Sequence, residues 1–291
     1  MTNLKFTDLG LKETLVKAID DLGFITPSPI QAEAIPVALE GIDIIGQAQT
    51  GTGKTAAFGL PLINNLTVKN AIGSIILAPT RELAIQVHDE LVKLTKYEKL
   101  NIVAVYGGAP IHIQARDLKK ANIVVGTPGR VLDHIRRGNL PLSCVEFLVL
   151  DEADEMLNMG FIDDMEEIMK SIPEERQTLL FSATMPPQIK KLSKKYLKED
   201  AQHIVIARKE MTGSTIKQNF FEVNGSQRLE ALCRLIDLDN PSAGIIFCRT
   251  KKGVDELVAS MQAKGYMVEG MHGDMSQIQR IKTLNKFCMV R

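Results

Sequence analysis

Short, unbroken runs of apolar residues recur along the first two thirds of this sequence of 291 residues, and they restrict its fold more than any other feature. Their β-branched residues follow one another without alternating polar positions, which is typical of strands buried on both faces of a parallel sheet. Residues 81–95 carry apolar side chains at helical spacing and join two of the runs. The sequence therefore predicts an α/β fold of β-α-β units with helices flanking a parallel sheet. The runs and the polar residues that follow them occupy 42–46, 74–80, 101–108, 122–130, 147–154 and 178–184.

Polar and small residues follow nearly every run at once: Gly, Pro, Thr, Ser or Asp. Because parallel strands end at the same edge of a sheet, these residues should gather along that edge. Ligands of open α/β sheets bind outside the carboxyl ends of the strands. The sequence therefore predicts a functional site there.

A change of pattern at 207–225, where charged residues mix with Gly, Ser and Thr, indicates a domain boundary. We place it near residue 208, which gives a first domain of residues 1–207 and a second of residues 208–291, smaller than most domains. In the second domain we expect helices at 226–238 and 251–265 and strands at 243–250 and 266–273.

The charge and cysteine content exclude several classes of protein. Thirty-five basic residues balance thirty-five acidic ones, so no overall field attracts a polyanion, and local contacts must hold any that binds. The four cysteines are scattered, which suggests neither a zinc site nor a disulfide framework. No run reaches the roughly 20 apolar residues that span a bilayer, and the first ten residues do not resemble a signal peptide. We expect a cytoplasmic protein without a membrane partner.

Residues 48–55, AQTGTGKT, form a glycine-rich segment between an apolar run and a predicted helix. Such a loop turns its backbone N–H groups toward phosphate oxygens, and the helix N-terminus adds positive charge. A lysine at position 54 reaches the outer phosphates and a threonine at 55 binds Mg²⁺. A purely structural turn is the alternative, and Ala48 stands where the usual pattern has Gly. The loop predicts a nucleoside triphosphate site formed by Gln49, Thr50, Gly51, Thr52, Gly53, Lys54 and Thr55.

Acidic residues follow the run FLVL directly. Asp151 is placed to hold Mg²⁺, and Glu152 to act as general base on the attacking water. We expect Asp154 to bond the hydroxyls of Ser182 and Thr184, which would link the nucleotide site to moving parts of the protein. An acidic cluster after a strand is more often a solvated loop, but the phosphate loop upstream favours the catalytic interpretation.

The sequence Asp151-Glu152-Ala153-Asp154, with the other motifs, resembles the DEAD-box ATP-dependent RNA helicases, in particular bacterial members of the cold-shock type. Residues 23–31, GFITPSPIQ, which include Phe24, resemble the family's adenine-sensing segment. The resemblance implies that Gln31 contacts the adenine edge and that Phe6 stacks on the base, although Phe6 alone is better explained as a core aromatic. It also implies ATP and Mg²⁺ as ligands and a RecA-like P-loop NTPase fold, followed by an incomplete second RecA-like domain.

Further motifs resemble the family's contacts with the RNA backbone. In isolation each is an ordinary turn sequence. Small residues, hydroxyls and arginines at strand-to-helix turns nevertheless suit phosphate binding, carry little base information and would let a neutral chain bind RNA. The implied contacts are Pro79, Thr80, Arg81, Gly107, Gly108, Thr127, Pro128, Gly129 and Arg130, with Arg249, Thr250, Gly273, Gln277 and Arg280 in the second domain.

The family continues past the segment that resembles 282–287 with strands and with arginines that reach the γ-phosphate, whereas this sequence ends at Arg291. We therefore expect a C-terminally truncated helicase whose ATP hydrolysis and RNA unwinding are impaired. Its expected partners are RNA and proteins of RNA degradation or ribosome assembly. Two alternatives stay open: a non-catalytic, ATP-gated RNA clamp and, less favoured by Gln31 and the DEAD sequence, a DNA translocase.

Overall fold

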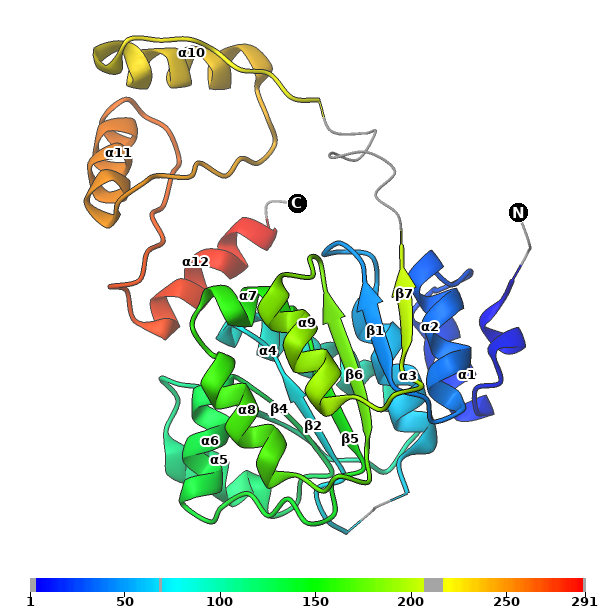
Figure 1. Ribbon diagram of the computed structural model, residues 1–291. Coiled ribbons are helices and arrows are strands. Elements are labelled where there is room, and N and C mark those ends of the chain that lie inside the picture. The colour runs from blue at the N-terminus through cyan, green and yellow to red at the C-terminus, as the bar shows by residue number, and fades with distance from the viewer. Residues whose placement is uncertain (1–3, 68–69, 207–216, 290–291) are drawn as a thin grey trace. The chain divides into compact units, whose positions relative to one another are not determined.

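A computed structural model describes residues 4–67, 70–206 and 217–289 of the chain (Figure 1). The chain divides into two compact units, Met1–Met211 and Thr212–Arg291. The boundary expected near residue 208 falls within 207–216, outside the described residues, and stays a prediction. Among the described helices, none has both the length and the apolar composition needed to cross a membrane.

The first unit is built on a seven-stranded sheet of order β3-β4-β2-β5-β6-β1-β7, in which every pair is parallel. The predicted α/β fold with a parallel sheet is confirmed. The sequence did not predict the edge strand β7, because it has one buried residue, Ile204, and therefore no continuous apolar run. The strands are β1 (Ile44–Gln47), β2 (Ser74–Leu77), β3 (Ile102–Val105), β4 (Ile123–Gly126), β5 (Phe147–Leu150), β6 (Gln177–Ser182) and β7 (Gln202–Val205).

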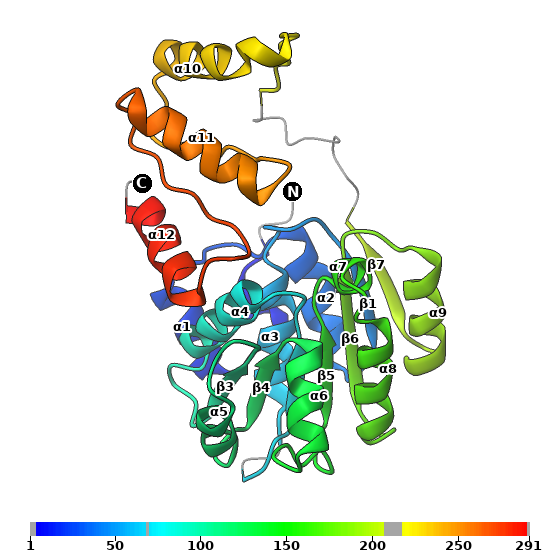
Figure 2. The same cartoon turned by 90° about the vertical axis from the view of Figure 1, so that its left-hand side faces the viewer.

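Helices cover both faces of this sheet, as Figures 1 and 2 show. Helices α1 to α4 contribute to one hydrophobic core and α5 to α9 to the other. Neighbouring strand residues alternate between the two cores: Ile76 belongs to the first, Ile75 and Leu77 to the second. Two buried faces explain the unbroken apolar runs. The helices are α1 (Glu13–Asp21), α2 (Pro29–Leu39), α3 (Lys54–Asn65), α4 (Arg81–Leu94), α5 (Ile111–Leu118), α6 (Pro128–Arg136), α7 (Ala153–Asn158), α8 (Ile162–Ser171) and α9 (Pro187–Tyr196), preceded by a 3-10 turn at Phe6–Leu9.

The second unit contains helices α10 (Arg228–Asp239), α11 (Lys251–Ala263) and α12 (Gln277–Met289), which follow a 3-10 turn at Gly225–Gln227. The helices expected at 226–238 and 251–265 are confirmed. The strands expected at 243–250 and 266–273 are wrong for this structure, since residues 217–289 contain no strand. A strand needs a hydrogen-bonded neighbour and a face to bury, whereas the side chains of Ile245, Phe247 and Met267 are exposed here.

Candidate functional site

The motifs of the first unit meet at the carboxyl edge of its sheet, as the sequence predicted. Residue Gln47, at the end of β1, lies beside Ser182 at the end of β6. At the end of β2, Leu77 lies between Leu150 of β5 and Gly126 of β4. The phosphate loop, the acidic segment and the segments at 79–83, 127–130 and 182–184 therefore all leave the same edge.

The phosphate loop folds tightly against the start of α3. Gly51 and Gly53 have φ angles of 79° and 86°, a left-handed conformation that glycine adopts without strain. The hydroxyl of Thr52 donates a hydrogen bond of 2.8 Å to the carbonyl of Gln49, which closes the turn. Gly53 is the residue before α3, so the loop leads directly into a helix N-terminus.

Two charged residues are buried at this site, Lys54 at the start of α3 and Asp151 at the end of β5. Within the described residues, neither Lys54 Nζ nor Asp151 Oδ1 has a hydrogen-bond partner. Burial raises the pKa of Asp151 to about 6, although the positive charge of Lys54 acts in the opposite direction. Unsatisfied buried charges are costly, and a triphosphate with Mg²⁺ would satisfy both. The residues present therefore fit that ligand.

Glu152 has a strained backbone, with φ 52° and ψ 53°, at a position where a glycine would be relaxed. Such strain costs on the order of 1 to 3 kcal/mol and is common at functional sites. The conformation brings its carboxylate to the phosphate loop, where Oε1 accepts a hydrogen bond of 3.3 Å from the hydroxyl of Thr50.

Asp154 contacts the segment at 182–184, as the sequence predicted. Its Oδ2 accepts hydrogen bonds from the backbone N–H of Thr184 at 2.8 Å and from the Thr184 hydroxyl at 2.7 Å. The backbone N–H of Asp154 donates to Ser182 Oγ at 3.2 Å. Partial burial acts to raise the pKa of Asp154, but the hydrogen bonds from Thr184 and Ser182 outweigh it and the pKa is lowered. The carboxylate is therefore fixed as an anion.

Gln31 joins the predicted adenine-sensing segment to the phosphate loop. Its Oε1 accepts a hydrogen bond of 2.9 Å from the N–H of Ser28, and its Nε2 donates one of 3.0 Å to the carbonyl of Gly53. Phe6 is 3% exposed and packs in the first core, as the alternative explanation expected, whereas Phe24 is 45% exposed. Stacking of Phe6 on a base stays a prediction.

The segments expected to contact RNA in the first unit lie close together. Thr80 caps α4 by accepting a hydrogen bond from the N–H of Leu83. Arg81 lies against the glycine pair, because a Cβ on Gly108 would be 2.4 Å from Arg81 Nη1. Arg130 Nη1 donates hydrogen bonds of 3.0 Å to the carbonyl of Ala109 and to Gln114 Oε1. The neighbouring residues of these segments are Pro79, Gly107, Thr127, Pro128 and Gly129.

Gln114 contacts Arg130, and the buried His134 lies with its Nε2 3.0 Å from Gln114 Oε1; the sequence predicted neither residue near this group. The five histidines are dispersed along the sequence, and Gln114 belongs to no motif. Their only signal in the sequence is a polar side chain among the apolar positions of a helix. The sequence does not show which residues such a side chain contacts.

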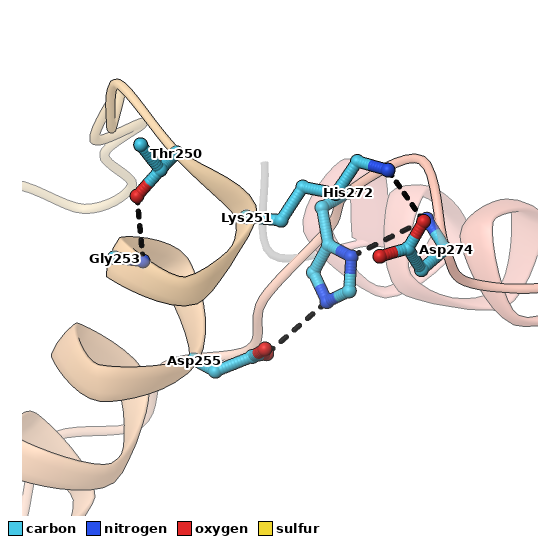
Figure 3. Close-up of polar contacts among 6 residues, drawn as sticks. All are labelled: Thr250, Lys251, Gly253, Asp255, His272 and Asp274. Atoms are coloured by element: carbon cyan, nitrogen blue, oxygen red, sulfur yellow. Dashed lines mark hydrogen bonds and ion pairs between the residues drawn. The ribbon is translucent and has the colours of Figure 1, made fainter.

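In the second unit, polar contacts connect the start of α11, which Thr250 caps, to the turn at 272–274 (Figure 3). The hydroxyl of Thr250 caps this helix by accepting from the N–H of Gly253 at 3.0 Å. Lys251 pairs with Asp274 at 2.5 Å, which holds the turn containing Gly273 beside the helix. Farther along, Arg280 Nη1 lies 3.5 Å from Gln277 Oε1. Among the described residues, no hydrogen bond or ion pair joins Arg249 to this group.

His272 strengthens the same turn. Its Nδ1 accepts from the N–H of Asp274 at 3.4 Å, so its Nε2 carries the hydrogen that Asp255 accepts at 3.1 Å (Figure 3). Helix α11 and the turn before α12 are therefore connected through two separate pairs.

A parallel sheet with a phosphate loop after its first strand and a buried acidic residue after β5 defines the P-loop nucleotide-binding proteins of RecA-like fold. A family model described as "DEAD/DEAH box helicase" matches residues 28–192. A second, "Helicase conserved C-terminal domain", matches residues 227–289. The chain belongs to the DEAD/DEAH box helicase family, and the predicted resemblance is confirmed.

Individual relatives agree with this assignment. The chain is 53% identical to "ATP-dependent RNA helicase CshA" of Listeria monocytogenes, over 97% of this chain and 55% of that protein. It is 49% identical to the Bacillus subtilis "DEAD-box ATP-dependent RNA helicase CshA", over 98% of this chain and 58% of that protein. The chain thus spans little more than half the length of these curated relatives.

Solved structures share the fold. A DEAD box protein from Methanococcus jannaschii is 45% identical with a TM-score of 0.68, and the match covers 98% of this chain and 77% of that one. The Saccharomyces cerevisiae protein Dbp5, bound to RNA and ADP BeF3, is 32% identical with a TM-score of 0.88, and the match covers 99% and 74% of the two chains.

Proposed function

We propose that this chain binds ATP with Mg²⁺ and the RNA backbone, and that it uses ATP hydrolysis to separate RNA strands locally. The observation that carries the proposal is the pair of buried, unsatisfied charges, Lys54 and Asp151, beside a left-handed glycine-rich loop. The names of the relatives from Listeria and Bacillus, which are ATP-dependent RNA helicases, support the same activity.

The residues divide the work at the nucleotide. The loop N–H groups and Lys54 bind the outer phosphates, while Thr55 and Asp151 hold Mg²⁺, which when bound neutralises phosphate charge. Glu152 accepts a proton from the attacking water, a contribution of about 10² to 10⁴ in rate for a general base. Gln31 reaches the loop at Gly53 and positions it relative to the base.

Asp154, Ser182 and Thr184 carry the state of the nucleotide site toward the RNA-binding surface. Asp154 lies two residues after Glu152 and is bonded to Thr184 through both the backbone and the side chain. A movement of the acidic segment on ATP hydrolysis would therefore displace the segment that follows β6.

The RNA-binding surface contacts the sugar-phosphate backbone. Backbone N–H groups at the starts of α4 and α6, together with Arg81 and Arg130, suit phosphate oxygens. We propose that Thr250, Gly273, Gln277, Arg280 and Arg249 contribute similar contacts from the second unit. We further propose proteins of RNA degradation or ribosome assembly as partners, from family resemblance alone.

These 291 residues alone should hydrolyse ATP slowly and unwind little RNA. The supporting observation is that segments 243–250 and 266–273 form no strand in the described second unit and that the side chains of Ile245, Phe247 and Met267 are exposed. A helicase needs two ordered domains that close on ATP, and γ-phosphate arginines raise the rate by about 10³ to 10⁵.

An ATPase assay of the purified chain with and without RNA tests the proposal. Slow turnover that RNA stimulates supports it, and RNA-stimulated turnover at a normal helicase rate contradicts the expected impairment. Binding of ATP and RNA without any turnover supports the non-catalytic clamp instead. Competition between RNA and DNA oligonucleotides tests the second alternative, since preferential binding of DNA would favour a DNA translocase.

A further inference from the structure

A chain of buried polar groups connects helices α5 and α6 to the loop between β3 and α5. Gln114 of α5 is 6% exposed, and His134 of α6 is 0% exposed. Gln114 Oε1 accepts a hydrogen bond of 3.0 Å from Arg130 Nη1 and lies 3.0 Å from His134 Nε2. Gln114 Nε2 donates to the carbonyl of Tyr106 at 3.1 Å, and Arg130 Nη1 also donates to the carbonyl of Ala109 at 3.0 Å.

The hydrogen-bond pattern determines where His134 carries its hydrogen. Since the amide nitrogen of Gln114 donates to a carbonyl, its oxygen is the acceptor, and His134 Nε2 must carry a hydrogen. Burial, followed by the charge of Arg130, lowers the pKa of His134, so the ring is neutral at neutral pH. The bonds with Gln114 therefore require one orientation of its amide and one tautomer of His134, with the hydrogen on Nε2.

This arrangement holds the loop at both ends. Tyr106 and Ala109 flank the glycine pair. The carbonyl of Tyr106 accepts from Gln114, and the carbonyl of Ala109 accepts from Arg130. Arg81, from the strand-to-helix turn after β2, lies against Gly108 on the same loop. Gln114 thus bonds residues of the segments that follow β3 and β4, and the segment after β2 reaches the same loop through Arg81. A guanidinium that is held in place loses less conformational entropy on binding than a mobile one.

We propose that Gln114 and His134 are positioning residues of the RNA-binding site: they hold Arg130 and the loop at 106–109 in the arrangement that contacts the RNA backbone. The inference rests on the proposed function, since it requires RNA at this surface. Neither residue touches RNA, because both side chains are buried. Their effect passes through Arg130 and the loop carbonyls.

A purely structural role would differ in a measurable way. In a purely structural role, loss of the buried hydrogen bond lowers stability whatever residue stands at position 130. The resulting loss of RNA affinity would then multiply with the loss caused by an Arg130 substitution. A positioning role predicts the opposite, because a residue that acts through Arg130 has little left to position once the guanidinium is removed.

The experiment is a double-mutant cycle on the full chain with Gln114→Leu, Arg130→Met and the double variant. Affinity for a labelled single-stranded RNA oligonucleotide is measured by fluorescence anisotropy at several salt concentrations, with Mg²⁺ and a non-hydrolysable ATP analogue. We expect about tenfold weaker binding for Arg130→Met and about 2- to 10-fold for Gln114→Leu. The double variant should bind about as weakly as Arg130→Met. The salt dependence of Gln114→Leu should fall toward that of Arg130→Met, because a phosphate contact is lost.

A matched control is Gln86→Leu, which changes an exposed glutamine bonded to Glu90 on α4 and should leave RNA affinity unchanged. Binding of a fluorescent ADP should be equal in all variants. If Gln114→Leu does not fold, as judged by circular dichroism, His134→Leu replaces it: this change removes one donor to Gln114 and should weaken RNA binding about 2- to 3-fold, again only when Arg130 is present.

The outcomes separate the inference from the proposed function. Losses that multiply in the double variant, or full RNA affinity in Gln114→Leu, overturn the positioning role while RNA binding itself stands. A wild-type chain that binds no RNA, or an Arg130→Met variant with unchanged RNA affinity, overturns the proposed RNA site and the inference with it.

Discussion

The side-chain amide of Gln31 donates a hydrogen bond of 3.0 Å to the carbonyl of Gly53, the last residue before the helix that begins at Lys54. The bond joins residues 22 positions apart in the sequence and makes the conformation of the phosphate loop depend on the first turn of α2, which contains Gln31. One hydrogen bond therefore connects Gln31, which the family resemblance assigns to adenine binding, to the phosphate loop.

Replacing Gln31 with leucine should weaken ATP binding about 2- to 10-fold, because the bond to Gly53 and the acceptor for Ser28 N–H are both lost. Titration with a fluorescent ATP analogue measures the effect. Gln31→Glu is the matched variant: it keeps an acceptor for Ser28 but has no donor for Gly53, so it should share the loss. Wild-type affinity in both variants would show that the bond does not support nucleotide binding.

Replacing Lys54 with methionine should reduce ATP affinity at least about tenfold. The change removes a buried ammonium that has no hydrogen-bond partner among the described residues, while it keeps an unbranched chain of similar size. Charge-assisted contacts with phosphate contribute about 1.5 to 3 kcal/mol each. Isothermal titration calorimetry with Mg·ATP checks it, with the exposed Lys191→Met as control. Equal affinity in the Lys54 and Lys191 variants would mean that the phosphates bind elsewhere.

Replacing Glu152 with glutamine should leave ATP binding intact and slow its hydrolysis about 10² to 10⁴-fold, because an amide does not accept the proton of the attacking water. Single-turnover hydrolysis of radiolabelled ATP separates this step from binding. Glu155→Gln is the control, since Glu155 is exposed on the following helix and bonds Asn158. Slower hydrolysis in the Glu155 variant, with an unchanged rate in the Glu152 variant, would show that Glu152 is not the general base.

The first unit illustrates how far a sequence determines a fold. Six of its strands and the edge at which the site forms followed from the apolar runs, because a strand buried on both faces leaves no other pattern. The strand β7 and the pair Gln114 and His134 did not follow, since one exposed edge strand and two isolated polar residues acquire meaning only from neighbours distant in sequence. The strands predicted in the second unit are absent for the same reason. Phe247 is a residue type that favours strands, but a strand forms only beside a partner, and Phe247 is exposed here.

The raised pKa of Asp151 predicts a pH-dependent stability in the absence of ligand. With a folded-state pKa of about 6 and an ordinary value of 3.8, the folded state binds more protons between these values. The contribution of this group to stability is therefore full below pH 3.8 and is lost as pH rises toward about 6. Asp151→Asn, which stays neutral, should gain stability relative to wild type across that interval, by an amount on the order of 1 to 3 kcal/mol. Urea unfolding between pH 4 and 7.5 measures the difference, and a difference independent of pH would exclude the shift.

Two left-handed glycines allow the contact between Arg81 and the loop at 106–109 to be tested apart from backbone strain. Gly108 and Gly138 have φ angles of 85° and 69°, so an alanine at either position should cost about 1 to 2 kcal/mol of stability. A Cβ at 108 would be 2.4 Å from Arg81 Nη1, whereas no described atom beyond the two adjacent residues lies within 4 Å of one at 138. Gly108→Ala should therefore displace Arg81 and weaken RNA binding about 2- to 10-fold, while Gly138→Ala should destabilise the fold without changing RNA affinity. Thermal unfolding and fluorescence anisotropy on both variants separate the two effects. Equal RNA affinities at equal loss of stability would show that the position of Arg81 against the glycine pair has no part in binding RNA.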